Sequence, residues 1–271
     1  MPASKTPSTC RLTQAYRALR LALHFLWMAI GGACLYPFSS VSRRAQLKQR
    51  WSKKVLDILA IKLDTHPTEA PCGCLVIANH ISWLDIFAIN AVRPAAFIAK
   101  AEIRQWPLIG WLAAHNDTVF LHRGSHGHAR VVNTKIDELL NSGNDVALFP
   151  EGTTTDGTRL LGFHAALLQP AIETGRPILP LAISYLNASG SISLAPSFAG
   201  ETSLMQCVFA ILASPQLTVR LTPLPIIEST DKSRRELSQA AHTAITEALS
   251  TRRGFHPANN PPEKLPGLPD E

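Results

Sequence analysis

The chain has 271 residues, of which 46% are hydrophobic and 17% are charged. This composition excludes a disordered chain and provides a sizeable core, either for one large α/β domain or for two modest domains. Its 26 Lys and Arg residues exceed its 20 Asp and Glu residues, which gives a net charge of +6. The mean hydropathy of +0.07 lies between those of soluble and polytopic membrane proteins. The basic excess could serve nucleic acid, anionic lipid or a phosphorylated substrate, and the charge alone does not choose among them.

A basic N-terminal segment contains an apolar stretch from Leu21 to Phe38, interrupted by His24. Its length is at the lower limit for a helix that spans a bilayer core. Basic residues flank it on both sides and so give no orientation for a span. We expect it to enter one leaflet of an anionic bilayer, with a single transmembrane anchor as the alternative. The flanking residues are Lys5, Arg11, Arg17, Arg20, Arg43, Arg44, Lys48, Arg50, Lys53 and Lys54.

Residues 1–65 are predicted to form membrane-associated helices. These comprise the apolar stretch, a break around Pro37 and a second helix from Val41 to Leu63. Residues 66–250 are predicted to form an α/β domain, because they contain short apolar runs typical of strands buried on both faces. The runs are 75–78, 95–99, 118–121, 145–149 and 178–185, with a further strand at 217–221.

Helical patterns separate several of these runs. One extends from Ala129 to Leu140, with Gly143 as its C-terminal cap, and another covers residues 237–249. The alternation predicts an α/β fold with a mixed, mainly parallel sheet flanked by helices. Residues 204–213 fit a buried helix or a second lipid-facing run equally well. The proline-rich tail, residues 251–271, is predicted to be disordered.

The first candidate site residues follow the strand at 75–78. His80 lies in the loop, and Asp85 falls on the first turn of the next helix. If the loop folds back, the carboxylate can hold one ring nitrogen as a donor and leave the other as a base. Alternatively, Ser82 and Asp85 form a capping box and His80 is incidental. These residues alone leave both interpretations open.

Two further clusters contain residues suited to binding a polar substrate. Glu151, Gly152 and Thr153 follow the strand at 145–149, where a carboxylate could contact substrate hydroxyls. An ordinary Pro/Gly turn is the alternative. Lys100 and Arg123 lie at the ends of two other predicted strands, and Arg123 could bind a phosphate with both arms of its guanidinium.

Several patterns that would indicate other chemistry are absent from the sequence. It has no Gly-x-Ser-x-Gly elbow, no Walker loop, no Gly-x-Gly-x-x-Gly after a strand and no His-Glu-x-x-His. The five cysteines are scattered, which suits a reducing compartment, and their spacing predicts no metal site. The basic run 43–54 contains only one aromatic residue, Trp51, so no nucleic-acid partner is expected.

The order and spacing of four blocks resemble the glycerolipid acyltransferases of the 1-acylglycerol-3-phosphate acyltransferase type. The blocks are Asn79 to Asp85, Lys100 to Arg123, Phe149 to Thr153 and Ile178 to Ile183. The resemblance implies that His80, oriented by Asp85, deprotonates the hydroxyl of a lysophospholipid. The acceptor would be 1-acylglycerol-3-phosphate and the product phosphatidic acid. The hydroxyl oxygen would attack the thioester of acyl-CoA or acyl-carrier protein directly.

The resemblance also implies the surroundings of the reaction. No metal or cofactor is required beyond the acyl donor, and the protein would lie at the cytoplasmic face of a membrane, the inner membrane in a bacterium. Its partners would be the anionic bilayer and the acyl-CoA or acyl-carrier protein. The implied substrate-binding residues are Asn79, Lys100, Arg123, Glu151, Gly152, Thr153 and Arg159.

Two positions depart from the family pattern. Thr154 stands where arginine is frequent, and His164 follows Phe163 where lysine is expected. Both changes remove a cation near the headgroup site, although Arg159 could substitute. A different acceptor, such as lyso-ornithine lipid, is therefore an alternative. A non-catalytic membrane-bound protein on the same fold is a second one, and a lysophospholipid hydrolase, which would need an activated Ser or Cys, is a third.

Overall fold

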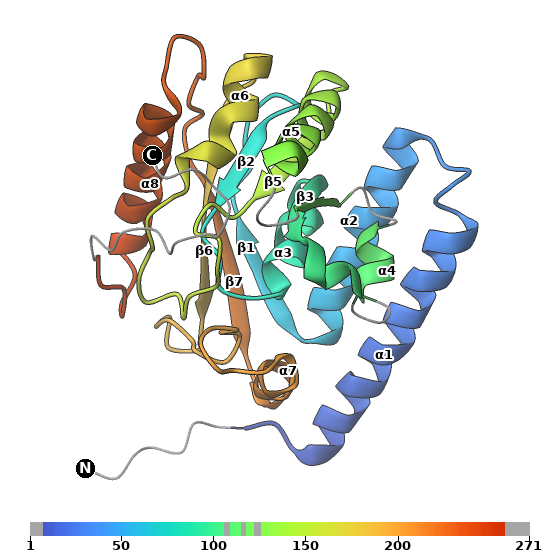
Figure 1. Ribbon diagram of the computed structural model, residues 1–271. Helices are drawn as coiled ribbons and strands as arrows, with labels where there is room; N and C mark the ends of the chain where they lie inside the picture. Colours follow the sequence, from blue (N-terminus) through green and yellow to red (C-terminus); the bar gives the residue numbers. More distant parts are fainter. Residues whose placement is uncertain (1–7, 106–108, 115–117, 122–125, 258–271) are drawn as a thin grey trace.

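A seven-stranded sheet forms the centre of the computed structural model, which describes residues 8–105, 109–114, 118–121 and 126–257 (Figure 1). The strand order is β1-β7-β6-β2-β5-β3-β4, and among these described strands only the β6–β7 pair is antiparallel. The strands are β1 (Ile61–Thr65), β2 (Leu75–Ala78), β3 (Ala95–Lys100), β4 (Val119–Leu121), β5 (Asp145–Leu148), β6 (Ile178–Leu186) and β7 (Leu217–Pro223). The predicted mixed, mainly parallel sheet is confirmed.

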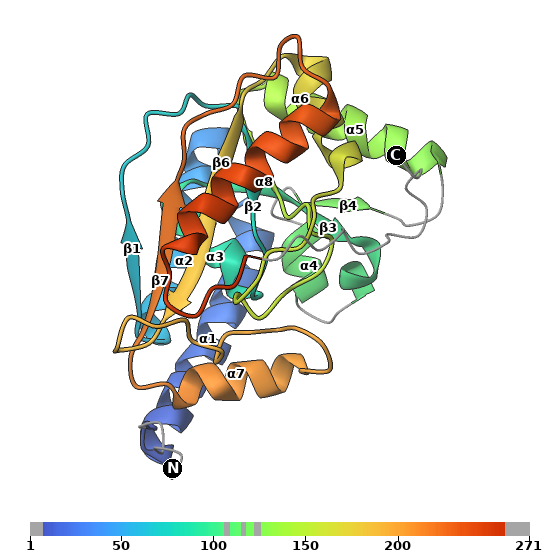
Figure 2. The same cartoon turned by 90° about the vertical axis from the view of Figure 1, so that its left-hand side faces the viewer.

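Helices cover both faces of the sheet, because alternate residues of its central strands are apolar in both directions. In β2, Val76 and Ala78 pack toward one helical layer, and Leu75 and Ile77 toward the other. The first layer contains α1 (Arg11–Cys34), α2 (Val41–Ile58), α3 (Leu84–Val92) and α7 (Leu204–Ala213). The second contains α5 (His126–Asn141), α6 (Gln169–Thr174) and α8 (Arg234–Ser250). In Figure 2, α8 lies in front of the sheet and α2 behind it.

Three shorter helical segments complete the described elements. They are the 3-10 helices η1 (Ala101–Gln105) and η2 (Ala165–Leu168) and the helix α4 (Ile109–Ala114). Gly143 follows α5 with a φ of +81°, a left-handed conformation that suits glycine at a helix end. The predicted cap is therefore confirmed.

The predicted second helix is too long at its C-terminal end. Helix α2 stops at Ile58, and residues 61–65 form strand β1, which pairs in parallel with β7. The alternation of apolar Ile61 and Leu63 with polar Lys62 and Asp64 has the period of a strand. The Asp64 carboxylate also lies 2.6 Å from Nε of Arg220 on β7, so the edge strand is fixed by an ion pair.

The predicted disorder of the tail is wrong for its first residues. Phe255 is buried in the core layer that contains α8, and the His256 amide donates to the Thr158 carbonyl at 2.7 Å. An aromatic side chain in the tail therefore packs against the domain. Residues 258–271 lie outside the described part of the chain.

Helix α1 packs closely on α2 through glycine. A Cβ atom at Gly31 would lie 2.6 Å from Cζ2 of Trp51, so only glycine permits this contact.

Lys48 on α2 is buried and donates to the Ala95 carbonyl at 3.1 Å, which corrects its expected place among the surface cations. No helix within the described residues combines the length and hydropathy needed to cross a membrane.

Candidate active site

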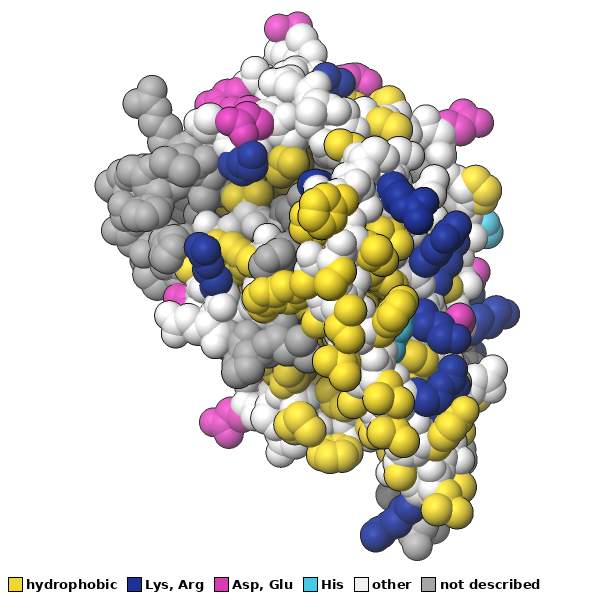
Figure 3. All heavy atoms as spheres, turned by 90° about the vertical axis from the view of Figure 1, so that its right-hand side faces the viewer, with side chains coloured by type: hydrophobic (Ala, Val, Ile, Leu, Met, Phe, Trp, Pro, Cys, Tyr) yellow, Lys and Arg dark blue, Asp and Glu magenta, His cyan; other side chains and the backbone are white. Residues whose placement is uncertain are grey.

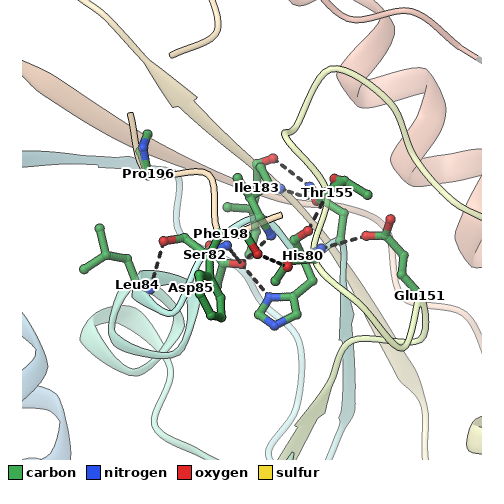
Figure 4. Close-up of polar contacts among 12 residues, drawn as sticks. His80, Ser82, Leu84, Asp85, Glu151, Thr155, Ile183, Pro196 and Phe198 are labelled. Carbon is green, nitrogen blue, oxygen red and sulfur yellow. Dashed lines mark hydrogen bonds and ion pairs between the residues drawn. The ribbon is translucent and has the colours of Figure 1, made fainter. Parts of the chain in front are cut away.

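His80 and Asp85 meet at the carboxyl end of β2. His80 lies in the loop after the strand, and its Nδ1 is 2.8 Å from Oδ2 of Asp85, which lies on the first turn of α3 (Figure 4). The same oxygen accepts the main-chain N–H groups of Ile81 and Ser82 at 2.7 and 2.9 Å. The loop therefore folds back as the sequence predicted.

This arrangement sets the direction of the hydrogen bond between the two side chains. Asp85 is completely buried, and main-chain N–H groups donate to it, as they do to an ionised carboxylate. Nδ1 of His80 is therefore the donor, and Nε2 carries the lone pair of a base. Nε2 has no hydrogen-bond partner among the described residues.

The predicted capping box forms only in part, because the N-cap residue of α3 is Trp83, whose side chain makes no capping hydrogen bond. The Ser82 hydroxyl accepts the Leu84 N–H at 3.3 Å, and Asp85 accepts the Ser82 N–H. Asp85 thus stabilises the start of α3 and orients His80 at the same time. The two interpretations describe two roles of one carboxylate rather than competing structures.

The His80 ring stacks on Phe149, at the end of the neighbouring strand β5. The ring centroids are 3.9 Å apart and the planes differ by 8°. The ring is held in its plane by this stacking and along its edge by Asp85. With 21% of its side-chain surface exposed, His80 remains accessible.

Glu151 holds the main chain on the other side of His80. Its Oε1 accepts the His80 N–H at 2.7 Å, and its Oε2 accepts the Leu161 N–H at 3.0 Å. The His80 carbonyl in turn accepts the Thr155 N–H at 2.8 Å. Burial raises the pKa of Glu151 to about 8, although the two main-chain donors act in the opposite direction. Glu151 has no exposed surface and makes these structural contacts, and its expected substrate contact stays a prediction.

Asn79 joins the end of β2 to β6. Its Nδ2 donates to the Ile183 carbonyl at 3.0 Å, and its Oδ1 accepts the Ile183 N–H at 2.7 Å. Only 2% of Asn79 is exposed, and its expected substrate contact likewise stays a prediction. Its amide fixes the distance between the His80 loop and β6.

The other expected substrate-binding residues are only partly described. Gly152 has a φ of +72° in a half-buried turn, Thr153 is half-buried, and Arg159 is exposed. Lys100 ends β3, but its side chain lies outside the described part of the structure, as does the whole of Arg123. Their roles stay predictions. The described ranges contain no group of three or more His, Cys, Asp or Glu residues that could hold a metal ion.

Sequence reasoning missed two residues of the site. Phe149 was part of a noted cluster but was given no role, and Tyr185 was treated only as part of an apolar strand. The Tyr185 hydroxyl donates to Oδ1 of Asp85 at 2.7 Å. A signal was present, since a tyrosine in a strand buried on both faces needs a partner for its hydroxyl.

The α/β fold and the sequence, compared with known proteins, define the class of protein. Residues 62–184 match the model of the Acyltransferase family. The lyso-ornithine lipid O-acyltransferase of Pseudomonas aeruginosa is 36% identical over 206 residues, which are 76% of this chain and 79% of that protein. This chain belongs to the acyltransferase family, as the four sequence blocks predicted.

Two other comparisons extend this result. The 1-acyl-sn-glycerol-3-phosphate acyltransferase of Neisseria meningitidis is 40% identical over 167 residues, and the match spans slightly less than two thirds, 65%, of that protein. The crystal structure of the 1-acyl-sn-glycerophosphate acyltransferase from Thermotoga maritima has a TM-score of 0.58 and 23% identity, covering 88% of this chain and 98% of that one. The latter similarity shows a shared fold.

Proposed function

We propose that the protein transfers an acyl chain from a thioester, acyl-CoA or acyl-carrier protein, to the free hydroxyl of a lysolipid. The observation that carries this proposal is the His80–Asp85 pair, in which Nδ1 is held and Nε2 is available. Family membership supports it, because the relatives named above are lysolipid acyltransferases. The acceptor we propose first is 1-acylglycerol-3-phosphate, which gives phosphatidic acid.

The proposed step needs no acyl-enzyme. Nε2 of His80 takes the proton of the acceptor hydroxyl while its oxygen forms a bond to the thioester carbonyl carbon. The carbon–sulfur bond then breaks, and the proton passes from Nε2 to the leaving thiolate. Asp85 stabilises the imidazolium that exists between these events. General base catalysis contributes about 10²- to 10⁴-fold, so the positioning of the two substrates supplies much of the remainder.

Lyso-ornithine lipid is the second candidate acceptor, and two observations favour it. The relative from Pseudomonas aeruginosa, which matches over most of its length, is named for this acceptor. In addition, Thr154 stands where the family often has a cation, and its hydroxyl donates to the Phe198 carbonyl. This side chain fixes a loop and offers no charge to a phosphate.

Parallel assays with each acceptor distinguish the two candidates. Purified full-length protein is given lysophosphatidic acid or lyso-ornithine lipid, each with acyl-CoA or acyl-carrier protein, and products and free fatty acid are measured by mass spectrometry. We expect acyl transfer to one of the two, with no fatty acid released, and loss of transfer in His80→Ala. Absence of transfer to either lysolipid would contradict the proposal, and fatty acid release would indicate a hydrolase.

We further propose that the protein binds the cytoplasmic face of a membrane without crossing it. Figure 3 shows apolar side chains gathered on the α1 side of the molecule, with Lys and Arg along one border. Such a continuous exposed apolar face is typical of an interaction surface, and the basic border favours anionic lipid. The exposed large apolar residues of α1 are Leu12, Tyr16, Leu19, Leu23, Leu26, Trp27 and Ile30.

Helix α7 extends this membrane face. It buries Cys207, Ile211 and Leu212 but exposes Met205 and Phe209. Hydrogen bonds tie its C-terminal end to the start of α1, since the Thr9 N–H donates to the Ala213 carbonyl at 2.9 Å. The predicted alternatives of a buried and a lipid-facing helix thus apply to opposite sides of α7.

Vesicle flotation tests the membrane proposal. Wild type should float with vesicles that contain phosphatidylglycerol and much less with pure phosphatidylcholine. Leu23→Glu and Phe209→Glu should each weaken flotation, whereas Ile226→Glu should not. Ile226 is exposed near the start of β6, at the end of the strands opposite the site. Equal flotation of all three variants would contradict the assignment of this face.

A further inference from the structure

Tyr185 contacts the carboxylate that orients His80, and it comes from a strand far along the chain. It lies on β6, and its hydroxyl donates to Oδ1 of Asp85 at 2.7 Å. Tyr185 is 1% exposed and Asp85 is not exposed at all, so water does not compete for this contact. The hydrogen bond therefore joins two buried groups, one of them charged.

The two oxygens of Asp85 have different partners. Oδ2 receives the His80 ring and two main-chain N–H groups, whereas the donor on Oδ1 is Tyr185. Without Tyr185, Oδ1 would be a buried anionic oxygen with no donor in the described structure. Such a group is costly, and a carboxylate with one bare oxygen is also a stronger base.

The position of β6 relative to the loop is itself fixed. Asn79, which immediately precedes His80, is paired through both atoms of its amide with the main chain of Ile183. Ile183 and Tyr185 are two residues apart on a strand and therefore point to the same face, the one that α3 covers. The Asn79 contact thus holds the Tyr185 hydroxyl at the height of Asp85.

We propose that Tyr185 is a positioning residue for acyl transfer, acting through Asp85 as the far end of a Tyr185–Asp85–His80 chain. This inference rests on the proposed function. The hydroxyl holds Oδ1, so that Oδ2 stays directed at the His80 ring. It also shares the negative charge of the carboxylate, which limits how far Asp85 raises the basicity of Nε2, the atom that must release its proton to the leaving thiolate.

Tyr185 can serve as a donor throughout the working pH range. Burial and the charge of Asp85 raise its pKa well above the ordinary value of 10.0, so the hydroxyl keeps its proton. The other titratable groups near Asp85 are Glu151, from the turn after β5, and Cys207, from α7. Burial raises the pKa of the Cys207 thiol, which stays neutral, and raises that of Glu151 to about 8.

The variant Tyr185→Phe removes only the hydroxyl. We expect kcat to fall about 10- to 100-fold, with KM for the lysolipid little changed. This fold-change corresponds to the free energy that a hydrogen bond to a charged group contributes. We also expect the acidic limb of the pH–rate profile to move to higher pH, since a carboxylate without its donor stabilises the protonated His80 ring more strongly. The same shift should persist in a Glu151→Gln background, which removes the group that titrates nearby.

The matched control is Ser229→Ala. The Ser229 hydroxyl is also fully buried and donates to a carbonyl, that of Ala171, at 2.8 Å. It should lower stability but change neither kcat per folded molecule nor the pH profile. If Tyr185→Phe behaves like this control, Tyr185 is a structural residue only and the inference is overturned.

Two further measurements keep the inference testable if the variant folds poorly or if the acceptor is wrong. Replacing all three tyrosines by 3-fluorotyrosine preserves shape and strengthens the donor, so the acidic limb should move to lower pH. Nitrogen-15 spectra of the His80 ring, assigned with His80→Gln, need no substrate. The ring signals should change at higher pH in Tyr185→Phe than in wild type. An unchanged titration would overturn the role of Tyr185, whereas absence of transfer to any lysolipid would overturn only the proposed function.

Discussion

A buried carboxylate pairs with a basic side chain at each end of helix α3, and the two pairs differ. At the first turn, Asp85 holds Nδ1 of His80. Just beyond the last turn, Nε of Arg93 lies 2.7 Å from Asp145, and the same guanidinium donates to the Ala70 and Pro71 carbonyls. The Nη atoms of Arg93 thus donate to fixed acceptors, Asp145 among them at 2.9 Å, whereas among the described residues only Nδ1 of the His80 ring has a hydrogen-bond partner.

On the proposed mechanism, this difference separates a structural pair from a catalytic one. Asp145 also accepts the Cys74 N–H at 2.9 Å. Its pair with Arg93 therefore links α3, β2 and β5 at the amino-terminal ends of these strands, opposite the site. Both carboxylates stabilise the fold, but only Asp85 acts on a side chain that can still exchange a proton. Substitution of each should therefore give opposite balances of activity and stability.

The largest contrast is expected between Asp85→Asn and Asp145→Asn. Asp85→Asn should lower kcat at least about 10²-fold, because the amide has one acceptor oxygen for donors that now occupy two and has no charge to stabilise the imidazolium. Asp145→Asn should lower the free energy of unfolding by about 3 kcal/mol, as expected when a buried pair is broken, without changing kcat per folded molecule. Steady-state kinetics and urea unfolding of both variants would decide, and equal kinetic effects would remove the distinction.

A smaller effect is expected at Glu151, which holds the main chain of His80 rather than its ring. A glutamine has one acceptor oxygen, so Glu151→Gln leaves either the His80 or the Leu161 N–H unpaired. An unpaired buried donor costs about 1–3 kcal/mol, and we expect about a tenfold loss of kcat. A loss as large as that of Asp85→Asn would mean that Glu151 touches the substrate.

The same carboxylate should make stability depend on pH. Since folding raises the pKa of Glu151 from 4.5 to about 8, the folded protein binds more protons than the unfolded chain between these values. The free energy of unfolding should therefore fall as pH rises through this window, by up to about 1.4 kcal/mol per pH unit. Urea unfolding between pH 5 and 8 measures this slope, and Glu151→Gln should flatten it. An equal slope in the variant would assign it to another group.

The smallest effect is expected at the stacked ring. Phe149→Leu removes the face on which His80 rests, and aromatic pairs contribute about 0.5–1.5 kcal/mol beyond their area, so kcat/KM should fall a few-fold. Phe97→Leu is the control, because Phe97 contacts Phe149 but is not stacked on His80. Equal losses in the two variants would show that core packing, not the stacking, matters.

Local patterns were enough to predict most of the sheet and the His80 loop. The run at 75–78 is apolar at every position because β2 is buried on both faces, and a histidine two residues after it had to lie at the carboxyl end of the sheet. Strand β1 was missed because it follows α2 with neither proline nor glycine between them. The chain turns instead at Ala60, with a φ of +56°.

The rest of the site depends on contacts between distant residues. Tyr185 and Asp85 are 100 residues apart, and Asn79 and Ile183 are 104 apart. No spacing rule within one strand or helix reports such contacts. For the same reason, the buried roles of Asn79 and Glu151 could not be told from substrate contact, since position after a strand suits either.

The central claim is that His80 acts as the general base from within this frame. Its most direct test is the rate of acyl transfer by wild type and by His80→Ala, measured with the preferred lysolipid and normalised to folded protein. We predict a fall of about 10²- to 10⁴-fold with the vesicle binding unchanged. Transfer by His80→Ala at the wild-type rate would contradict the claim.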